Sequence, residues 1–389
     1  MPVNPANPPQ PALRAADKET FAHFTAKHRW RDIVKKGIDN IRDSLNNSGI
    51  DKNEEGKKIM ASMEELINQI QRNDQLTQIE DDGRPDILTW TDALNTYFKG
   101  ENWFTASWLF AECYLYRRII SIITNTKHWR NYDPYFRQKE ESFKLSFSGI
   151  LEFSKRIDEL ISSSKVKIDD SIIFYELAQI SLWGNATDLS MLPNFGTDEN
   201  IETKRFEESK KNILVNDLEK AWKWLSKYSN ARVDFILDNA GFELYSDLIF
   251  SDWLIQSGYV SEVHLHIKPI PWFVSDTTLD DFNWLFKTLK SNDLFSSASE
   301  TEKSSLEKLV DRWQSKLVYD CKWETVTPFK EAIGPLANSK NALPVLSLRT
   351  GKSDVFVGLD EGVEERLGPD KSWMYSGKYA AIQFSEGSK

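Results

Sequence analysis

Apolar residues recur at helical spacing through the first part of the chain. From Thr20 to about Ser163, large apolar side chains repeat every three or four residues, and short polar stretches separate the repeats. No alternating strand pattern intervenes in this part. The pattern predicts a helical domain over residues 16–170. The Pro- and Ala-rich residues 1–15 before it are predicted to form a disordered tail.

The period changes after about residue 170. Short apolar runs typical of strands then alternate with helical segments, and the strand-like runs are 233–237, 260–267, 345–348, 355–357 and 379–384. Helices are predicted between several of them, at 242–257 and 279–289. Alternation of strand and helix indicates a parallel sheet covered by helices, so residues 171–389 are predicted to form an α/β domain of three layers.

The polar turn after the apolar run 233–237 organises this second half. Asp238 and Asn239 follow the run directly, and Gly241 precedes the next helical repeat. In open α/β sheets, ligands bind outside the carboxyl ends of the strands. The oxygens of Asp238 and Asn239 can bind a metal, and the following helix N-terminus can bind an anion. A second interpretation, a simple turn with a helix cap, is equally compatible with this spacing.

Two further polar groups follow apolar runs. Asp276 comes after Trp272-Phe-Val-Ser, and Arg349 and Lys352 come after the run 345–348. Two carboxylates and an amide oxygen suit Mg²⁺ or Mn²⁺ better than structural zinc, and Arg and Lys bind phosphate oxygens. Together they favour phosphoryl chemistry, in which the metal polarises the phosphoryl oxygen. The nucleophile is either a metal-bound water or Asp238 itself.

Other polar residues have an alternative structural interpretation. Glu112 lies in an apolar helical stretch five positions before Arg117, and such a carboxylate is usually paired with an arginine. Asn185 lies either in a cleft or in an ordinary turn. His264 and His266 point to one face of a predicted strand, but a metal site would need a third ligand that the nearby sequence lacks.

Composition narrows the class of protein. The chain has 389 residues, of which 28% are charged, and a formal net charge of −10, which argues against nucleic acid or an anionic membrane as the main partner. Two cysteines without a C-x-x-C pair indicate a reducing compartment. No N-terminal apolar segment and no membrane-length apolar run is present. We therefore expect a cytoplasmic protein, with the nucleus as a second location, and its oligomeric state stays open.

Several segments of the chain resemble one family. They are W-L-F-A-E-C-Y-L-Y-R-R (108–118), S-L-W-G-N-A-T-D-L-S (181–190), N-D-L-E-K-A-W (216–222), L-D-N-A-G-F-E-L (237–244), V-S-D (274–276), A-I-G-P-L-A (332–337) and S-L-R-T-G-K (347–352). At these positions the chain resembles the metal-dependent damage-control phosphatases, formerly domain of unknown function 89, and within them the eukaryotic branch marked by R-T-x-K. The matching segments span most of the chain.

The resemblance implies a helical N-terminal domain on a Rossmann-like three-layer α/β/α sandwich with a mostly parallel sheet. It implies that Asp238, Asn239 and Asp276 bind a divalent metal, with Mn²⁺, Co²⁺ or Ni²⁺ supporting activity and Mg²⁺ also possible. It implies that Lys352 contacts the substrate phosphate, with Arg349 and Asn185 as further candidate contacts. The implied substrates are small phosphorylated metabolites such as fructose 1-phosphate and fructose 6-phosphate.

One family segment has no match in this chain. Family members carry G-D-L-N-Y-R before a K-W-E-T stretch, whereas here residues 311–315 run directly into 316–323. Its loss would remove a central strand and part of the phosphate pocket. A catalytically weak phosphosugar-binding protein is therefore one alternative to a phosphatase. The other is S-adenosylmethionine-dependent methylation of protein carboxylates, for which no G-x-G turn is found after a strand.

Overall fold

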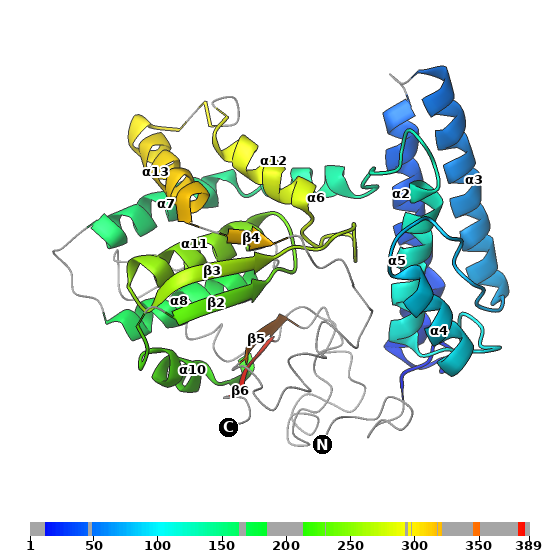
Figure 1. Cartoon of the computed structure of the whole chain (residues 1–389), viewed down its shortest axis with the longest axis horizontal. Helices are drawn as coiled ribbons and strands as arrows, with labels where there is room; N and C mark the ends of the chain where they lie inside the picture. Colours follow the sequence, from blue (N-terminus) through cyan, green and yellow to red (C-terminus); the bar gives the residue numbers. More distant parts are fainter. Residues whose placement is uncertain are drawn as a thin grey trace. The chain divides into compact units, whose positions relative to one another are not determined.

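The computed structural model forms two compact units, which are described in turn (Figure 1). The residues that the structure describes are 12–45, 49–162, 169–184, 213–229, 231–291, 295–296, 298–316, 318–320, 345–350 and 380–385. Among them, the helical unit comprises 12–138 together with Lys268–Asp276. The α/β unit comprises Lys139–Ile267 and the described residues from Thr277 onward.

The helical unit is built from amphipathic helices around one apolar core. Its elements are α1 (Phe21–Phe24), the π-helix η1 (Thr25–Arg29), α2 (Trp30–Leu45), α3 (Ile50–Arg72), α4 (Ile87–Tyr97) and α5 (Trp108–Thr124). The long helices α2 and α3 pack together, and α5 contacts both. The repeating apolar positions, such as Ile33, Val34 and Ile41 in α2, are buried. The helical interpretation of this part of the chain is therefore confirmed.

Ordered structure begins earlier than the sequence predicted. Within the predicted tail, Ala15 is fully buried, and Arg14 forms a bridge to Ser107. The backbone N–H of Trp108 donates to the carbonyl of Leu13 at 2.8 Å. The predicted disorder is thus wrong for residues 12–15, because backbone pairing next to the start of α5 fixes them. Residues 1–11 lie outside the described part of the chain.

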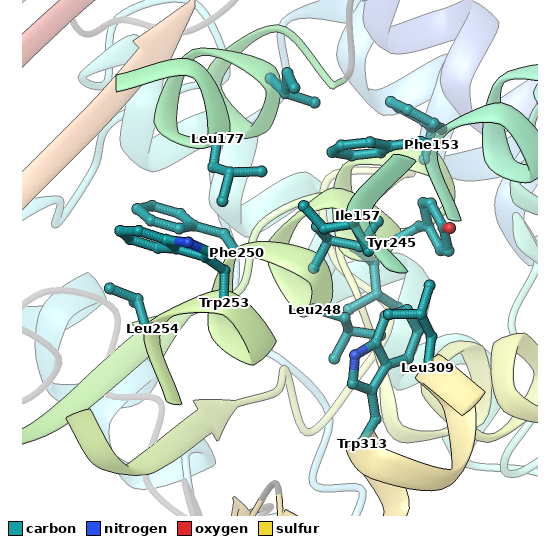
Figure 2. Packing of buried hydrophobic residues seen from close by; sticks show 14 of the residues in the cluster. Phe153, Ile157, Leu177, Tyr245, Leu248, Phe250, Trp253, Leu254, Leu309 and Trp313 are labelled. Atoms are coloured by element: carbon teal, nitrogen blue, oxygen red, sulfur yellow. The ribbon is translucent and has the colours of Figure 1, made fainter. Parts of the chain in front are cut away.

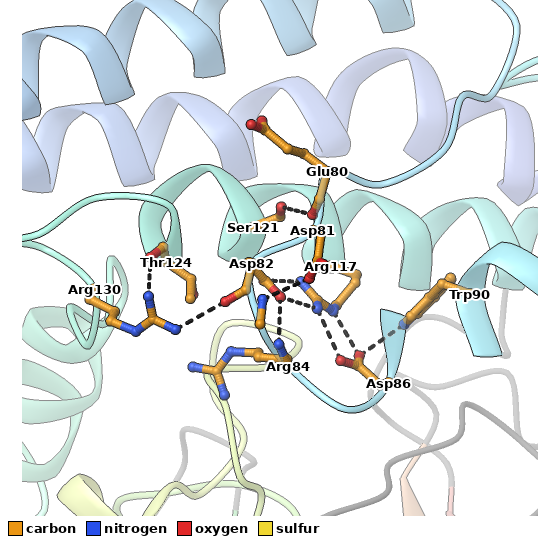
Figure 3. A network of polar contacts seen from close by, with 11 residues as sticks. Glu80, Asp81, Asp82, Arg84, Asp86, Trp90, Arg117, Ser121, Thr124 and Arg130 are labelled. Carbon is orange, nitrogen blue, oxygen red and sulfur yellow. Dashed lines mark hydrogen bonds and ion pairs between the residues drawn. The ribbon is translucent and has the colours of Figure 1, made fainter. Parts of the chain in front are cut away.

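A buried ion network ties α5 to the segment before α4. Arg117 has no exposed surface and donates to both carboxylates of Asp82 and Asp86, with its Nη1 2.7 Å from Asp82 Oδ2 and its Nε 2.7 Å from Asp86 Oδ2 (Figure 3). Asp86 also accepts from the Trp90 indole N–H at 3.1 Å. Removal of one partner of such a pair would leave a buried charge without compensation, which is costly. The network therefore favours this one arrangement of α5 and the segment before α4.

The described strands of the α/β unit form two sheets of three strands. One has the order β2-β3-β4 and is parallel throughout, and the other has the order β1-β6-β5, in which only the β5–β6 pair is antiparallel. The strands are β1 (Ile213–Asn216), β2 (Ala231–Ile236), β3 (Val260–His266), β4 (Val318–Asp320), β5 (Val345–Thr350) and β6 (Ala380–Ser385). The predicted α/β class with mostly parallel strands is confirmed. The predicted strand at 355–357 lies outside the described residues.

Helix α11 forms the centre of the α/β core. The helices associated with this unit are α6 (Phe136–Lys144), α7 (Phe147–Ser162), α8 (Asp170–Trp183), α10 (Leu218–Leu225), α11 (Phe242–Gln256), α12 (Leu279–Leu289) and α13 (Glu300–Lys316). Helix α11 packs on β3 and against α7, α8 and α13. Tyr245, Leu248 and Trp253 of α11 lie within this cluster (Figure 2). A helix that is apolar on all sides is expected where every side is covered.

The two units divide within α6. The helical unit ends at Gln138, whereas the sequence predicted a boundary at residue 170. Helices α7 and α8 bury their apolar faces against α11 and α13, so they belong to the α/β unit. Within the described residues, no helix combines the length and the apolar character needed to cross a membrane.

Candidate functional site

The strand, polar turn and helix predicted around Asp238 are present. Strand β2 ends at Ile236, and the Leu237 N–H still donates to the carbonyl of His266 on β3 at 3.1 Å. Asp238 and Asn239 follow at the carboxyl end of the strand. Gly241 has a φ of 81°, which glycine adopts at low cost, and this reverses the chain into α11. The turn therefore places Asp238 and Asn239 between a parallel strand end and a helix N-terminus.

Asn239 is held by a residue that the sequence analysis did not single out. Its backbone N–H donates to Glu243 Oε1 at 3.2 Å, and its side-chain Nδ2 donates to Glu243 Oε2 at 3.0 Å. The same Nδ2 donates to Asp238 Oδ2 at 3.2 Å. Glu243 lies in the first turn of α11, four positions after Asn239. The spacing of four residues could have indicated this contact from the sequence, because residues four apart can contact each other at the start of a helix.

Carboxylates are concentrated at the start of α11. Burial raises the pKa of Glu243 well above its ordinary value, and the nearby charges of Asp238 and Asp247 raise it further. Burial also raises the pKa of Asp247 to about 7, although Ser181 Oγ donates to this carboxylate. Ionisation of these acids is thus opposed by desolvation and by mutual repulsion. A divalent cation would offset this repulsion, and the oxygen donors of Asp238 and Asn239 fit a hard ion.

The sequence predicted that Asp276 lies at a strand end. Instead, Asp276 directly follows a turn of residues 273–275 in the helical unit. It is 4% exposed, and its Oδ2 lies 2.8 Å from Lys268 Nζ. Its N–H donates to the carbonyl of Trp272 at 3.2 Å. Phe273 and Val274 have φ of 42° and 71°, which is strained for residues with a Cβ and incompatible with a strand. The apolar run was misleading because consecutive apolar residues can also form a compact turn.

The residues after Asp276 are fixed within the α/β unit. The Thr277 N–H donates to the carbonyl of Asp238 at 2.6 Å. Thr278 caps α12, since its Oγ1 accepts from the Asp281 N–H and the Asp281 carboxylate accepts from the Thr278 N–H at 2.9 Å. The buried Lys139 donates to Asp281 Oδ2 at 2.6 Å. This capping box and ion pair hold the backbone that directly follows Asp276.

The remaining predicted residues are not brought together with Asp238 by the described structure. Arg349 lies inside β5, opposite Ala381 of β6, and so belongs to the other sheet. Strand β5 continues to Thr350, two residues beyond the predicted end at 348, because antiparallel pairing with β6 extends to that residue. Lys352 and Asn185 lie outside the described residues.

The paired histidines make other contacts. His266 Nε2 lies 3.0 Å from Asp234 Oδ2, and His264 pairs with Glu262. Among the residues that the structure describes, no three His, Cys, Asp or Glu side chains form a cluster that could bind a metal. The predicted ligand set differs from such a cluster, because it contains two carboxylates and one amide.

Comparison with known proteins identifies the family. The family model described as the damage-control phosphatase ARMT1-like domain matches residues 25–332. The chain belongs to the damage-control phosphatase ARMT1-like family. Curated relatives named damage-control phosphatase ARMT1 are 33% identical in Xenopus tropicalis and 31% identical in Homo sapiens. These alignments cover 97% and 96% of this chain, and 99% and 98% of the relatives. The chain is thus a member of a family of phosphatases.

Two further details come from the comparisons. The alignment with the Xenopus tropicalis protein spans 447 residues, more than the 389 of this chain, so the relative carries insertions that are missing here. A solved structure of a DUF89 family protein from Pyrococcus horikoshii is 15% identical, with a TM-score of 0.35 over 77% of this chain and 72% of that chain.

Proposed function

We propose that this protein hydrolyses phosphate esters of small metabolites in a metal-dependent reaction. The substrates that we propose are sugar phosphates such as fructose 1-phosphate and fructose 6-phosphate. The main support is the position of Asp238 and Asn239 at the carboxyl end of β2, directly before the N-terminus of α11, in a chain that belongs to a phosphatase family. This is where α/β proteins bind phosphorylated ligands.

The proposed metal ligands are Asp238, Asn239 and Asp276. Their oxygens suit Mn²⁺, Co²⁺, Ni²⁺ or Mg²⁺. Burial raises the pKa values of Glu243 and Asp247, and the nearby Asp238 charge raises them further. When bound, the ion would polarise the phosphoryl oxygen and neutralise the charge that develops on it.

The protein groups would orient the phosphate and hold its charge. Lys352 is the proposed phosphate contact, and Arg349 and Asn185 are the further candidates. The N-terminus of α11 adds backbone N–H donors and the positive end of the helix dipole. Asp238 is the proposed catalytic residue. It would either be a ligand of the metal that activates the attacking water, or its carboxylate would bond to phosphorus as the sugar hydroxyl leaves, and water would then hydrolyse the aspartyl-phosphate.

The first prediction concerns Asp238→Ala, measured as phosphate release from fructose 1-phosphate. The full-length protein is stripped with a chelator and then given Mn²⁺, Co²⁺, Ni²⁺ or Mg²⁺. The variant should lose activity by at least about a hundredfold, the scale found when one preorganised charge-stabilising group is removed. Its thermal stability should stay close to wild type, because Asp238 is exposed and its loss leaves no core cavity.

Asp234→Ala is the matched control. Asp234 lies on the same strand and pairs at the surface with Arg232 and His266, so its loss should not change phosphate release. Wild-type turnover by a folded Asp238→Ala protein would refute the site. Metal binding without phosphate release from any substrate would favour a phosphosugar-binding protein instead. Transfer of a methyl group from S-adenosylmethionine to protein carboxylates, independent of metal, would favour the methyltransferase alternative.

A further inference from the structure

An asparagine can bind a metal with only one end of its side chain. The carbonyl Oδ1 is an acceptor and the NH₂ group is a donor, so an amide that is turned by half a rotation presents hydrogens to the cation. If Asn239 is a metal ligand, the protein needs a means of choosing between these two orientations.

The hydrogen bonds of Asn239 favour one of the two amide orientations. Nδ2 donates to two different carboxylates, Glu243 Oε2 at 3.0 Å and Asp238 Oδ2 at 3.2 Å. In this arrangement Glu243 Oε1 accepts from the Asn239 backbone N–H, and Glu243 Oε2 and Asp238 Oδ2 accept from Nδ2. A carboxylate oxygen that carries no proton can only accept a hydrogen bond. A reversed amide would therefore place Oδ1 against two acceptors and lose both bonds. The carboxylates thus direct Nδ2 toward themselves and Oδ1 away from them.

Glu243 is the partner that fixes this orientation independently of the metal. Asp238 is itself a proposed ligand, whereas Glu243 binds Asn239 twice, through the side chain and through the backbone N–H at 3.2 Å. The position of Glu243 is fixed as well. Gly184 at the end of α8 approaches so closely that an added Cβ would lie 2.8 Å from Glu243 Cα. The carboxylate therefore acts from a rigid part of the fold.

We propose that Glu243 is a positioning residue that sets the Asn239 amide with Oδ1 toward the divalent cation. This inference rests on the proposed function, because it takes Asn239 as a metal ligand. Partners that orient a metal ligand typically contribute 10- to 100-fold to metal affinity. Glu243 would act on affinity without touching the ion.

The test measures Mn²⁺ affinity by titration calorimetry and by the electron paramagnetic resonance of unbound Mn²⁺. In Glu243→Gln, the neutral side chain keeps its shape but has one acceptor oxygen in place of two. Mn²⁺ affinity should fall by about 10- to 100-fold. The matched control is Glu219→Gln, which changes the second residue of α10, the same helical position, at an exposed pair with Lys223. Its Mn²⁺ affinity should equal that of wild type.

The decisive comparison uses a second background, Asn239→Asp. A carboxylate has two equivalent oxygens and needs no orientation, and beside Glu243 it also meets a like charge. Adding Glu243→Gln to this background should therefore leave Mn²⁺ affinity unchanged or increase it, opposite to its effect beside Asn239. A merely structural role for Glu243 would reduce affinity in both backgrounds.

The outcomes separate this inference from the proposed function. Wild-type protein that binds Mn²⁺, together with an unchanged affinity in Glu243→Gln, would overturn the orienting role and leave the proposed metal site standing. Wild-type protein that binds no divalent ion would overturn both. If Glu243→Gln failed to fold, Glu243→Asp would replace it, because the shorter side chain cannot hold both Asn239 donors and should lower affinity in the same range.

Discussion

At the scale of single residues, Glu112 shows what the sequence could and could not predict. An arginine partner was predicted, and one is present, but it is Arg29 of η1, whose Nη1 lies 3.2 Å from Glu112 Oε1. Arg117, the nearby arginine, instead pairs with Asp82 and Asp86. Residues five apart do not share a helix face, so Glu112 and Arg117 are directed to different neighbours. Ion pairs of this kind depend on which helices pack together. The spacing of residues within one helix does not contain that information.

Glu112 also gives a prediction on pH and stability. Burial raises its pKa above the ordinary 4.5, although the Arg29 charge acts in the opposite direction. A raised pKa in the folded state means that protonation stabilises the fold below about pH 4.5 and that this contribution is lost as the pH rises through the folded pKa. Glu112→Gln should therefore melt at a higher temperature than wild type at pH 7, and the gain should disappear below pH 4.5.

Glu65→Gln is the control with the opposite sign. Hydrogen bonds from Arg72 lower the pKa of the exposed Glu65, so its charged form is the favoured one in the folded state. Removal of this charge should leave the melting temperature at pH 7 unchanged or slightly reduced. A Glu112→Gln protein that melts below wild type at pH 7 would show that the pair with Arg29 outweighs the cost of burial.

At the same scale, the candidate site was predicted only in part. Asp238 and Asn239 were found because an apolar run, a polar pair and a glycine are adjacent in the chain. Glu243 was missed because its role depends on a side-chain contact across the turn. Lys268 was missed because it meets Asp276 only through the turn that contains Phe273 and Val274.

At the scale of helices and strands, the sequence predicted which elements form better than it predicted which strands pair with each other. Strands β2 and β3 were recognised from their apolar runs, and their parallel pairing follows from the helix between them. The pairing of β1 with β6 joins Ile213 to Ala380, and no local pattern relates such distant segments. The turn before Asp276 was read as a strand end, although Pro271 already removes a donor that a strand would need.

The contact between α8 and α11 gives a prediction at this scale. A Cβ on Gly184 would lie 2.8 Å from Glu243 Cα and 3.0 Å from Ser246 Oγ. Since the nearest atom belongs to the backbone, the two helices would have to move apart. Gly184→Ala should lower the free energy of unfolding by about 1–3 kcal/mol, as overpacking of a core does, when measured by urea denaturation.

Gly49→Ala provides the matched control. An added Cβ at Gly49 meets no atom within 4 Å, and its φ of −66° suits any residue. This substitution should change stability by no more than about 0.5 kcal/mol. Equal stability of Gly184→Ala and wild type would mean that the two helices can separate at little cost and that Gly184 does not hold Glu243 in place.

At the scale of the whole molecule, the class of fold followed from the change of apolar period. The extent of each compact unit did not, since the segment 268–276 returns to the helical unit after strands of the α/β unit. Family membership extends over most of the chain, while the longer alignments of its relatives indicate that segments are missing here. Metal binding and turnover therefore need separate tests.

This distinction leads to the last prediction, in which stability reports metal binding without turnover. An ion that binds only the folded chain stabilises it by RT ln(1 + [L]/Kd), about 2.7 kcal/mol when the ion is at 100 times its Kd. For a unit of this size, that free energy raises the melting temperature by roughly 5–10 °C. Mn²⁺ added to chelator-treated protein should produce this shift in wild type and in Asp234→Ala, and Asp238→Ala should abolish it. An equal shift in Asp238→Ala would place the bound ion elsewhere. A shift in wild type without phosphate release would assign the loss of activity to the missing segments, because the metal ligands would then be intact.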